Sequence, residues 1–455
     1  MRTFMEEYKS KVITAEQAAR LVQSGMIVEY GQFATKPVDF DKALGARAGE
    51  EGLTNVTVRA TGSVPPVPAV AAQDPTHKSF TMSSWYFTAL DRGLSDKGIC
   101  IHRPFIYHEA PYVGYRDSFK YLRPDVWCSQ VAPMDQSGFF NFGLGNSQSY
   151  SFGSSAKIRI VEVNQNLPRC LGGYEEGFNI NDIDYIIEGT NSPIFTIPPA
   201  GAPTPEEKRI AEYIVEEIPN GACLQLGIGS MPNTIGMMVV DSDLKDLGIM
   251  SEMFCDAFVA MYDAGKITNK MKAVDRFKST YTFSLGTKET YDFLDNNPLL
   301  ASCPVNYVND PARVRANDKF ISINNILEID ILSQVCSESK GLRQISGTGG
   351  QLDFVIGAYE SLDGKSFLAF TSTYKDKNGE THSRIRPLLT PGAVVTVPRT
   401  MVHWIVTEYG KINLKGLTLW ERAEALINIA HPDFREDLIK EAEKMKLWRP
   451  TNKLP

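Results

Sequence analysis

The hydrophobic and polar positions of the first 31 residues predict a helix followed by a short strand. Thr14–Gln17 has the pattern of a capping box, and the apolar residues behind it recur at helical spacing. Ser24-Gly25 is expected to end this helix. Residues 26–30 then form a short apolar run that stops at Gly31.

The same order of elements returns in the second half of the chain. Thr204–Glu207 is a capping box with proline at the first helical position, and an apolar stripe follows. An apolar strand, 223–226, stops at Gly227. The segments SGMIVEYG (24–31) and NGACLQLG (220–227) therefore hold equivalent places. This predicts two halves of similar architecture.

A proline-rich segment separates the two halves. Residues 192–208 contain five prolines and show neither helical nor strand periodicity, which is typical of a linker. Apolar runs in the first half alternate with turns and helical segments, which is the rhythm of βα units around a mostly parallel sheet. We therefore predict an α/β protein with domains 1–195 and 209–455 joined by a linker, 196–208.

Composition narrows the functional class. The chain has 455 residues, of which 43% are hydrophobic and 22% charged, and its net charge is -7. That acidic balance does not favour nucleic-acid binding. No apolar run approaches the roughly 20 residues of a membrane span, and the N-terminus lacks a signal-like apolar segment. We expect a soluble, cytoplasmic protein without nucleic-acid or membrane partners.

Cysteine and histidine spacing argues against a metal centre. The seven cysteines are scattered without a CxxC pair, and the six histidines include no HxxxH pair. This pattern favours reduced thiols and predicts no disulfide framework or metal site.

The stretch Gly221–Asp256 contains the strongest candidates for a functional site. It predicts a strand, a glycine turn at 227–232, a helix, and a second strand that carries Glu252. A glycine turn before a helix leaves backbone N–H groups free to bind an anion. A carboxylate at the carboxyl end of a neighbouring strand lies where open α/β sheets bind ligands. From these residues alone, Glu252 is either a catalyst or a surface charge.

Three other segments leave two interpretations open. The glycines of 347–351 either admit a ligand to the backbone or form a tight turn. Residues 135–143 form a polar turn followed by aromatic residues, more typical of a loop packed on a core. Glu408, near the end of an apolar strand, is a site residue or a solvated charge.

Blocks of sequence throughout the chain resemble the acetyl-CoA hydrolase/transferase family. The resemblance is closest to its butyryl-CoA:acetate CoA-transferases, with 4-hydroxybutyrate CoA-transferases as near relatives. The matching blocks are QVAPMDQSGFFNFG (130–143), VEVNQNLPRCLGG (161–173), PNGACLQLGIGSMPN (219–233), SEMFCDAF (251–258), FISINNILEID (320–330), ISGTGGQLDFVIGAY (345–359), SRIRPLL (383–389), VTEYGKINLKGL (406–417) and RAEALINIAHPDFR (422–435).

This resemblance implies a fold and a set of site residues. The family fold has two similar open α/β domains of the CoA-transferase (NagB-RpiA-like) type, which face each other across a CoA cleft. The family's active-site glutamate corresponds to Glu252. Its CoA-binding positions correspond to the following residues: Gly227, Ile228, Gly229, Ser230, Met231, Leu327, Gly350 and Lys377.

The resemblance also implies a reaction. Glu252 would attack a short-chain acyl-CoA, most readily butyryl-CoA, carry CoA as a glutamyl thioester, and pass it to acetate in a ping-pong mechanism. Glutamate, with a reference pKa of about 4.3, would be ionised at neutral pH without tuning. Backbone N–H groups of Gly349 and Gly350 are candidates for the oxyanion site. Coenzyme A is then the substrate and covalent intermediate, and no metal is needed.

Other functions stay open at this point. The chain could transfer CoA to 4-hydroxybutyrate or propionate, hydrolyse acyl-CoA on the same scaffold, or bind CoA as an inactive sensor. A sugar-phosphate isomerase of related topology is disfavoured by the motif blocks. The family resemblance implies a homo-oligomer, a dimer or tetramer. Ser137, Met250 and Ser333–Cys336 depart from the family pattern and leave the exact substrate undetermined.

Overall fold

The computed structural model describes residues 4–198, 201–227 and 229–454. The chain divides into two compact units, one of Met1–Pro198 with Thr280–Val308 and one of Pro199–Ser279 with Asn309–Pro455. The first boundary falls inside the predicted linker, but helix α8 (Pro205–Val215) already begins before the end of that linker. The units are also not continuous in sequence, whereas the predicted domains are.

The first unit is built on a seven-stranded sheet with the strand order β4-β3-β2-β1-β5-β7-β9. Every neighbouring pair in this sheet is parallel. Its strands are β1 (Ile27–Tyr30), β2 (Val56–Ala60), β3 (Phe80–Ser84), β4 (Cys100–His102), β5 (Val126–Val131), β7 (Ile158–Val163) and β9 (Tyr185–Glu188).

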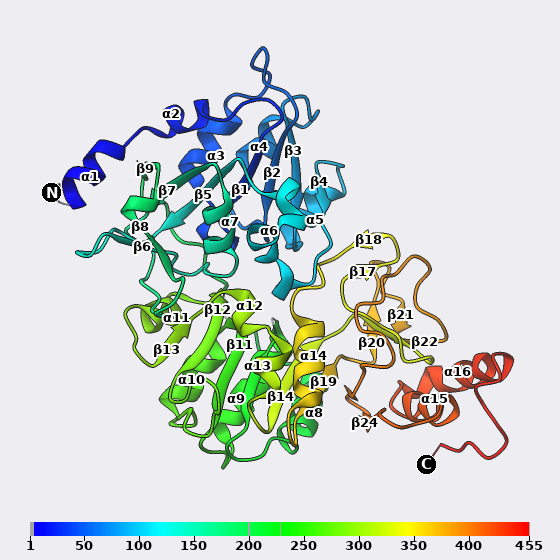
Figure 1. The fold of residues 1–455 in the computed structure, drawn as a ribbon. Coiled ribbons are helices and arrows are strands. Elements are labelled where there is room, and N and C mark those ends of the chain that lie inside the picture. The colour runs from blue at the N-terminus through cyan, green and yellow to red at the C-terminus, as the bar shows by residue number, and fades with distance from the viewer. Residues whose placement is uncertain (1–3, 199–200, 228, 455) are drawn as a thin grey trace. The chain divides into compact units, whose positions relative to one another are not determined.

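Helices connect these strands, and a small antiparallel pair lies outside the sheet (Figure 1). The helices are α1 (Phe4–Lys11), α2 (Ala15–Arg20), α3 (Val38–Gly45), α4 (Ala69–Gln73), α5 (Ala89–Ser95), α6 (Tyr112–Tyr115) and α7 (Ser149–Ser155), and the small pair is β6 (Phe139–Asn141) with β8 (Gly177–Asn179). Segment 280–308 adds most of β12 (Ser279–Ser284), α11 (Lys288–Leu294), β13 (Leu300–Ser302) and α12 (Val305–Val308).

Local sequence explains how the first sheet begins. The Thr14 side chain accepts from the backbone of Gln17, and the Gln17 side chain accepts from the backbone of Thr14, so the predicted capping box of α2 is confirmed. Beyond it, Val28 and Tyr30 of β1 are buried against Phe40 of α3 in one hydrophobic cluster. Burial of these apolar side chains fixes β1 in the middle of the sheet.

The second unit has its own sheet, which in this unit runs β11-β10-β14-β19-β23-β24. All pairs are parallel except β23 with β24, which are antiparallel. Its strands are β10 (Cys223–Leu226), β11 (Gly248–Phe254), β14 (Phe320–Asn325), β19 (Lys365–Ala369), β23 (Trp404–Thr407) and β24 (Gly410–Asn413).

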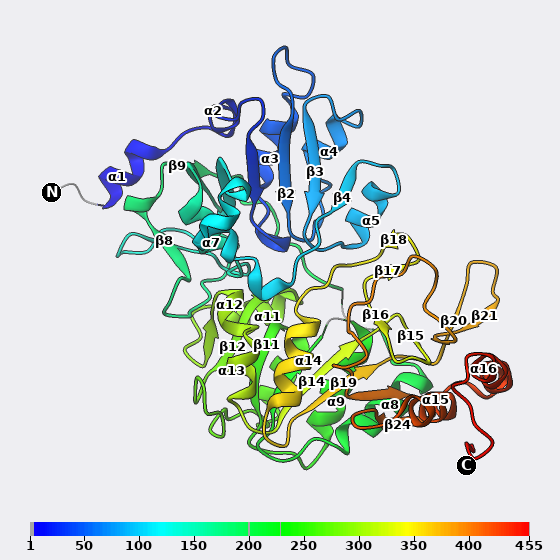
Figure 2. The same ribbon diagram turned by 45° about the vertical axis from the view of Figure 1, so that its right-hand side comes forward.

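Helices and several short strands complete the second unit. Figure 2 shows α15 and α16 next to each other near the C-terminus. The helices are α8, α9 (Ser230–Asp241), α10 (Asp256–Asp263), α13 (Pro311–Arg315), α14 (Gln351–Glu360), α15 (Leu419–Asn428) and α16 (Pro432–Lys444), and the short strands are β15 (Glu328–Asp330), β16 (Val335–Cys336), β17 (Ser339–Lys340), β18 (Arg343–Gln344), β20 (Thr373–Lys375), β21 (Thr381–Ser383) and β22 (Ile385–Arg386).

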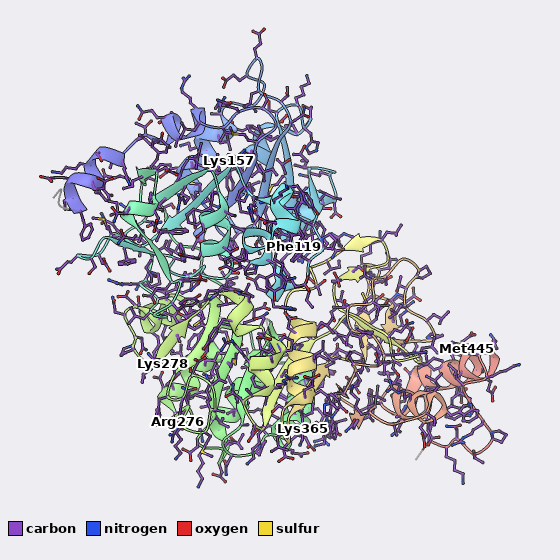
Figure 3. The ribbon with its side chains drawn as sticks, viewed as in Figure 1. Phe119, Lys157, Arg276, Lys278, Lys365 and Met445 are labelled. Carbon is purple, nitrogen blue, oxygen red and sulfur yellow. The ribbon has the colours of Figure 1, made fainter. Side chains whose placement is uncertain are left out.

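Charged and apolar contacts join these helices to the sheet. Lys365, labelled in Figure 3, opens β19 and forms an ion pair with Glu217 at 2.6 Å, just beyond the end of α8. Leu426 of α15 and Leu438 of α16 are buried in a common cluster with strand residues such as Ile405. The amphipathic spacing of the C-terminal helices therefore reflects packing against this sheet.

Both sheets place the strand that follows their first capped helix at the point where the strand order reverses. β1 lies between β2 and β5, and β10 lies between β11 and β14. The carboxyl ends of such strands are where open α/β sheets bind ligands. The prediction of an α/β fold with mostly parallel sheets is confirmed. Among the described residues, we find no helix with the length and apolar character needed to cross a membrane.

Candidate active site

Glu252 lies near the carboxyl end of β11. The strand pairs with β10 through Gly248 and Ile249, so Glu252 lies beyond the part of β11 that pairs with β10. Its neighbours Ser251 and Met253 are buried, whereas Glu252 itself is half-buried. Glu252 therefore lies on the strand where the sequence placed it, toward the carboxyl edge of the sheet, the edge at which open α/β sheets bind ligands.

Two groups from other segments hold the Glu252 carboxylate. The Asn309 side chain donates from Nδ2 to Oε2 of Glu252 at 2.7 Å. The backbone of Gly350 also hydrogen-bonds the carboxylate. Gly350 is the N-cap of α14, where unpaired helix N–H groups favour a negative charge. Strand β11, the segment before α13, and the start of α14 therefore converge on one carboxylate.

Gly350 is needed at this point because of space, not because of its backbone conformation. Its φ is -99°, which any residue adopts. A Cβ built on Gly350, however, would overlap with Oε2 of Glu252 and Nδ2 of Asn309. A tight turn alone therefore does not explain the glycine at position 350. The absence of a side chain at this position leaves room for the Glu252 carboxylate.

The environment changes the acidity of Glu252. Burial is the main cause that raises its pKa to about 7, and the negative charge of Asp353 raises it further. The hydrogen bonds from Asn309 and Gly350 act in the opposite direction. The expectation of a glutamate fully ionised at neutral pH without tuning does not hold, because burial disfavours the charged form. At pH 7 both forms of Glu252 are populated.

The glycine turn before α9 leaves the start of that helix open. Gly227 follows β10, and Gly229 is the N-cap of α9 with φ of +117°, a conformation that favours glycine. No side chain caps α9 within the described part of the chain. Ser230 uses its hydroxyl to donate to Glu207, while Met231 is buried. Ile228, also expected in this site, lies outside the described residues.

Leu327 and Lys377 lie on separate segments of the same unit. Leu327 follows β14 and is half-buried; its N–H donates to Cys336 at 2.9 Å and its carbonyl accepts from Arg384 at 3.1 Å. Both of its backbone polar groups thus already have a partner within the protein. Lys377 is exposed in the turn between β20 and β21. No hydrogen bond joins either residue to Glu252 in the part of the chain that the structure describes.

Glu408 is neither a free site residue nor a solvated charge. Its Oε2 accepts from the backbone N–H of Ser372 at 2.8 Å. Ser372 is buried in the turn between β19 and β20. Glu408 therefore anchors the chain that leads into the hairpin carrying Lys377. This contact gives Glu408 a structural role.

The departures from the family pattern occupy positions with local roles. Met250 is buried, and its sulfur accepts from Nδ2 of Asn317 at 3.4 Å. Ser333 is buried with φ of +68°, and its N–H donates to Asp330 at 2.8 Å. Cys336 is buried against Ser339, and the Ser137 N–H donates to Asp135 at 2.8 Å in an exposed turn.

Sequence reasoning missed Asn309 and Asp353. Asn309 is buried just before Asp310, whose side chain caps α13. Nothing in the local pattern separates it from an ordinary residue preceding a helix cap. Asp353 did carry a signal, since it is a charged residue within the otherwise apolar run that forms α14. A buried charge in such a run points to a nearby partner.

Within the described ranges, one group of side chains has the spacing to hold a metal ion. Ligand atoms of Asp376, Glu380 and His382 lie within 4.8 Å of one another on the β20–β21 hairpin. His382 Nε2 is 3.4 Å from Asp376, and the Glu380 backbone N–H donates to Asp376 at 2.9 Å. These contacts are those of an Asp-stabilised turn and account for the cluster.

Comparison with protein families gives two matches that together span most of the chain. The acetyl-CoA hydrolase/transferase N-terminal domain matches residues 1–198, and the corresponding C-terminal domain matches residues 286–442. Among curated relatives, a butyryl-CoA:acetate CoA-transferase of Anaerostipes caccae is 50% identical over 99% of this chain and 100% of its own length. A 4-hydroxybutyrate coenzyme A transferase of Clostridium kluyveri is 39% identical, covering 96% and 99%.

Solved structures give the same picture. RipA from Yersinia pestis superimposes with a TM-score of 0.89 at 34% identity, covering 98% of this chain and 100% of that protein. A 4-hydroxybutyrate CoA-transferase from Porphyromonas gingivalis superimposes with a TM-score of 0.79 at 31% identity, covering 97% and 100%. The chain spans the full length of these proteins.

Proposed function

This chain belongs to the acetyl-CoA hydrolase/transferase family and is a CoA-transferase, and from that premise we propose that it moves CoA between butyryl-CoA and acetate through a thioester on Glu252. The observation that carries the proposal is the convergence of Asn309 and Gly350 on the Glu252 carboxylate at the ligand edge of the sheet. The choice of butyryl-CoA and acetate rests on the relative that is 50% identical.

The reaction begins with Glu252 as a carboxylate nucleophile. One Glu252 oxygen attacks the thioester carbonyl; a C–O bond forms, the C–S bond breaks, and CoA leaves as the thiolate with the bonding electrons. The thiolate then attacks the glutamyl carbonyl of the mixed anhydride. A C–S bond forms, the C–O bond breaks, and butyrate leaves. Acetate reverses the sequence, so no proton or electron from outside is required.

The glycines before α14 are suited to stabilise the oxyanions of these steps. Gly349 has φ of +54° and Gly350 follows directly, so consecutive backbone N–H groups lie at the start of a helix. Such donors in a buried site are each worth about 3 to 4 kcal/mol of barrier. We assign Gly349 and Gly350 to the oxyanion site. Gly350 would then first hold the carboxylate and later the developing negative charge.

The uncapped start of α9 is suited to a phosphate of CoA. Its first-turn N–H groups have no side-chain acceptor at the N-cap, and the helix has 12 residues. We assign Gly227–Met231, together with Leu327 and Lys377, to CoA binding. Binding energy from the nucleotide part of CoA would then orient the thioester at Glu252.

The test is intact-protein mass spectrometry after incubation with butyryl-CoA and no acceptor. A CoA adduct that maps to Glu252 is expected, and acetate should remove it with formation of acetyl-CoA. Adduct-free protein in an active preparation would contradict the glutamyl thioester. CoA release at the same rate without acetate would instead indicate an acyl-CoA hydrolase.

The substrate is tested by a panel of acids and acyl-CoAs. Acetate, propionate and 4-hydroxybutyrate are compared as acceptors, and acetyl-CoA to hexanoyl-CoA as donors. We expect the largest kcat/KM with butyryl-CoA and acetate. One methylene is worth only about 1 to 3 kcal/mol in an apolar pocket, so neighbouring chain lengths should differ by about 10-fold or more. Preference for 4-hydroxybutyrate would contradict the assignment.

A further inference from the structure

Asp353 is a buried acid that lies next to the candidate nucleophile. It is fully buried in the first turn of α14, three residues after Gly350. Its Oδ2 is 3.5 Å from Nδ2 of Asn309, the nitrogen that donates to Glu252. That distance is long for a hydrogen bond, so the interaction is mainly electrostatic. One amide nitrogen thus faces two carboxylates.

This arrangement fixes the orientation of the Asn309 amide. Nδ2 is 2.7 Å from Glu252 Oε2 and 3.5 Å from Asp353 Oδ2. A flipped amide would turn its carbonyl oxygen toward both carboxylates, which is electrostatically unfavourable. Asp353 therefore selects the rotamer that offers a donor to Glu252. In the described residues, Oδ1 of Asn309 is buried without a hydrogen-bond partner, which is the cost of this orientation.

The charge of Asp353 also acts directly on Glu252. Of the groups that surround Glu252, Asn309 and the Gly350 backbone are uncharged, and Asp353 supplies the negative charge that disfavours ionised Glu252. That repulsion exists only while Glu252 is a carboxylate. In the anhydride and in the thioester the glutamyl group is neutral, so the repulsion is absent from both intermediates.

We propose that Asp353 is a positioning residue that holds the Asn309 amide toward Glu252 and, by its own charge, favours the neutral acylated forms of Glu252 over the free carboxylate. This inference rests on the proposed function. It assigns to Asp353 no contact with the substrate. Its effect is on the balance between the free enzyme and the glutamyl thioester, and on the pH at which Glu252 becomes nucleophilic.

The test compares Asp353→Asn with wild type in two measurements. At fixed concentrations of butyryl-CoA and butyrate, the equilibrium ratio of CoA-bearing to free enzyme should fall by about 10-fold, because the free carboxylate is no longer repelled. The acid limb of the kcat/KM profile should move to lower pH by about one unit, since removal of a negative charge makes Glu252 easier to ionise. KM for butyryl-CoA should change by less than about twofold.

Three further variants separate this role from a structural one. Asp353→Glu keeps the charge and should retain the wild-type acid limb. Asp353→Ser is a second neutral variant in case Asp353→Asn lacks a cooperative thermal transition, and the same shift is expected. Asp330→Asn removes another fully buried acid of the same unit, one that binds Gln334 rather than Asn309, and should leave the acid limb in place.

The outcomes distinguish this inference from the proposed function. An unmoved acid limb together with a wild-type adduct fraction in Asp353→Asn would overturn the inference alone. An equal shift in Asp330→Asn would also overturn it, because the effect would then be general. Failure of the active wild-type protein to form any adduct would overturn the proposed function instead.

Discussion

The two units share a capped helix followed by a central strand, and they differ in the chain that follows the glycine at the end of that strand. In the first unit the chain leaves β1 through Gly31, and in the second it leaves β10 through Gly227. After Gly31 come Gln32 and a single turn of 3-10 helix at Phe33–Thr35, before α3. After Gly227 the chain reaches Gly229 and enters the longer helix α9.

The helix N-termini at these two points differ in what occupies them. At α3, the Glu162 carboxylate accepts from the N–H groups of Val38 and Phe40, both at 2.9 Å. A carboxyl group of the first unit's own sheet thus occupies the N-terminus of that helix. At α9 the N-cap is Gly229, which has no side chain, and the nearby Glu207 carboxylate accepts from the Ser230 hydroxyl. The backbone N–H groups at the start of α3 are therefore hydrogen-bonded to a side chain, whereas the start of α9 has no side-chain cap among the described residues.

The comparison extends to acidity and shows that a raised pKa does not by itself identify a catalyst. Burial is the main cause that raises the pKa of Glu162 to about 7, as it does for Glu252. Glu162 is 1% exposed and fully engaged by donors, whereas Glu252 is half-buried at a sheet edge. Accessibility and the geometry of the surrounding donors separate the two roles.

The largest expected effect comes from exchanging each of these carboxylates for an amide. Glu252→Gln should reduce transfer by more than about 10³-fold, because the amide is a poor nucleophile, while CoA binding remains. Glu162→Gln should keep transfer within about threefold. Steady-state kinetics and calorimetric titration with CoA measure both. Near-normal turnover of Glu252→Gln, or equal losses in both variants, would contradict the different roles assigned to Glu252 and Glu162.

A smaller loss is expected from Gly350→Ala. The added methyl group would overlap with the carboxylate of Glu252 and the amide of Asn309, and must displace them. Since this displacement also disturbs the proposed oxyanion donors, kcat should fall by about 10²-fold while the Kd for CoA stays within about threefold. Unchanged kcat in a folded Gly350→Ala variant would contradict the role of this glycine.

Glu162→Gln also tests the comparison of the two carboxyl groups, through the pH dependence of the free energy of unfolding. The folded pKa of Glu162 is about 7, above the ordinary value of 4.5, so the neutral form is favoured in the folded state. Its contribution to stability is therefore fully present below about pH 4.5 and is lost as pH rises through 7. The unfolding free energy of wild type relative to Glu162→Gln should decrease by up to about 3 kcal/mol between pH 4 and 8.

Urea unfolding of both proteins at a series of pH values measures this difference. Gln at position 162 has no charge to lose, so that variant lacks the contribution. A difference that stays constant from pH 4 to 8 would show that the pKa of Glu162 is the same in the folded and the unfolded protein.

Local pattern was sufficient to predict the capping boxes and the central strands. Thr14 and Thr204 both form the predicted capping boxes, because each has Gln or Glu three residues later, as the motif requires. Strand β10 ends where Gly227 interrupts its apolar run. The family assignment is confirmed by matches along the chain, since several ordered blocks are far more specific than one motif.

Tertiary contacts were beyond the reach of local pattern. The apolar residues Phe354 and Val355 lie in a helix, α14, and sequence periodicity did not identify it. Asn309 meets Glu252 from 57 residues away in sequence. The raised pKa of Glu252 depends on burial, which is a property of the folded unit. The site is formed by contacts between segments that are distant in sequence, and local sequence patterns do not reveal such contacts.

The smallest expected effect concerns the open helix N-terminus itself. Gly229 has φ of +117° and open space where a Cβ would stand, so Gly229→Ala adds backbone strain without a clash. The strain should reorient the first N–H groups of α9 and weaken CoA binding by about 10-fold, as measured by calorimetry. Gly265→Ala, also at a positive φ of +68° in open space, is the matched control and should not alter the Kd for CoA. If both variants bind CoA like wild type, the open N-terminus of α9 is not the phosphate site, and the contrast with the closed N-terminus of α3 has no functional meaning.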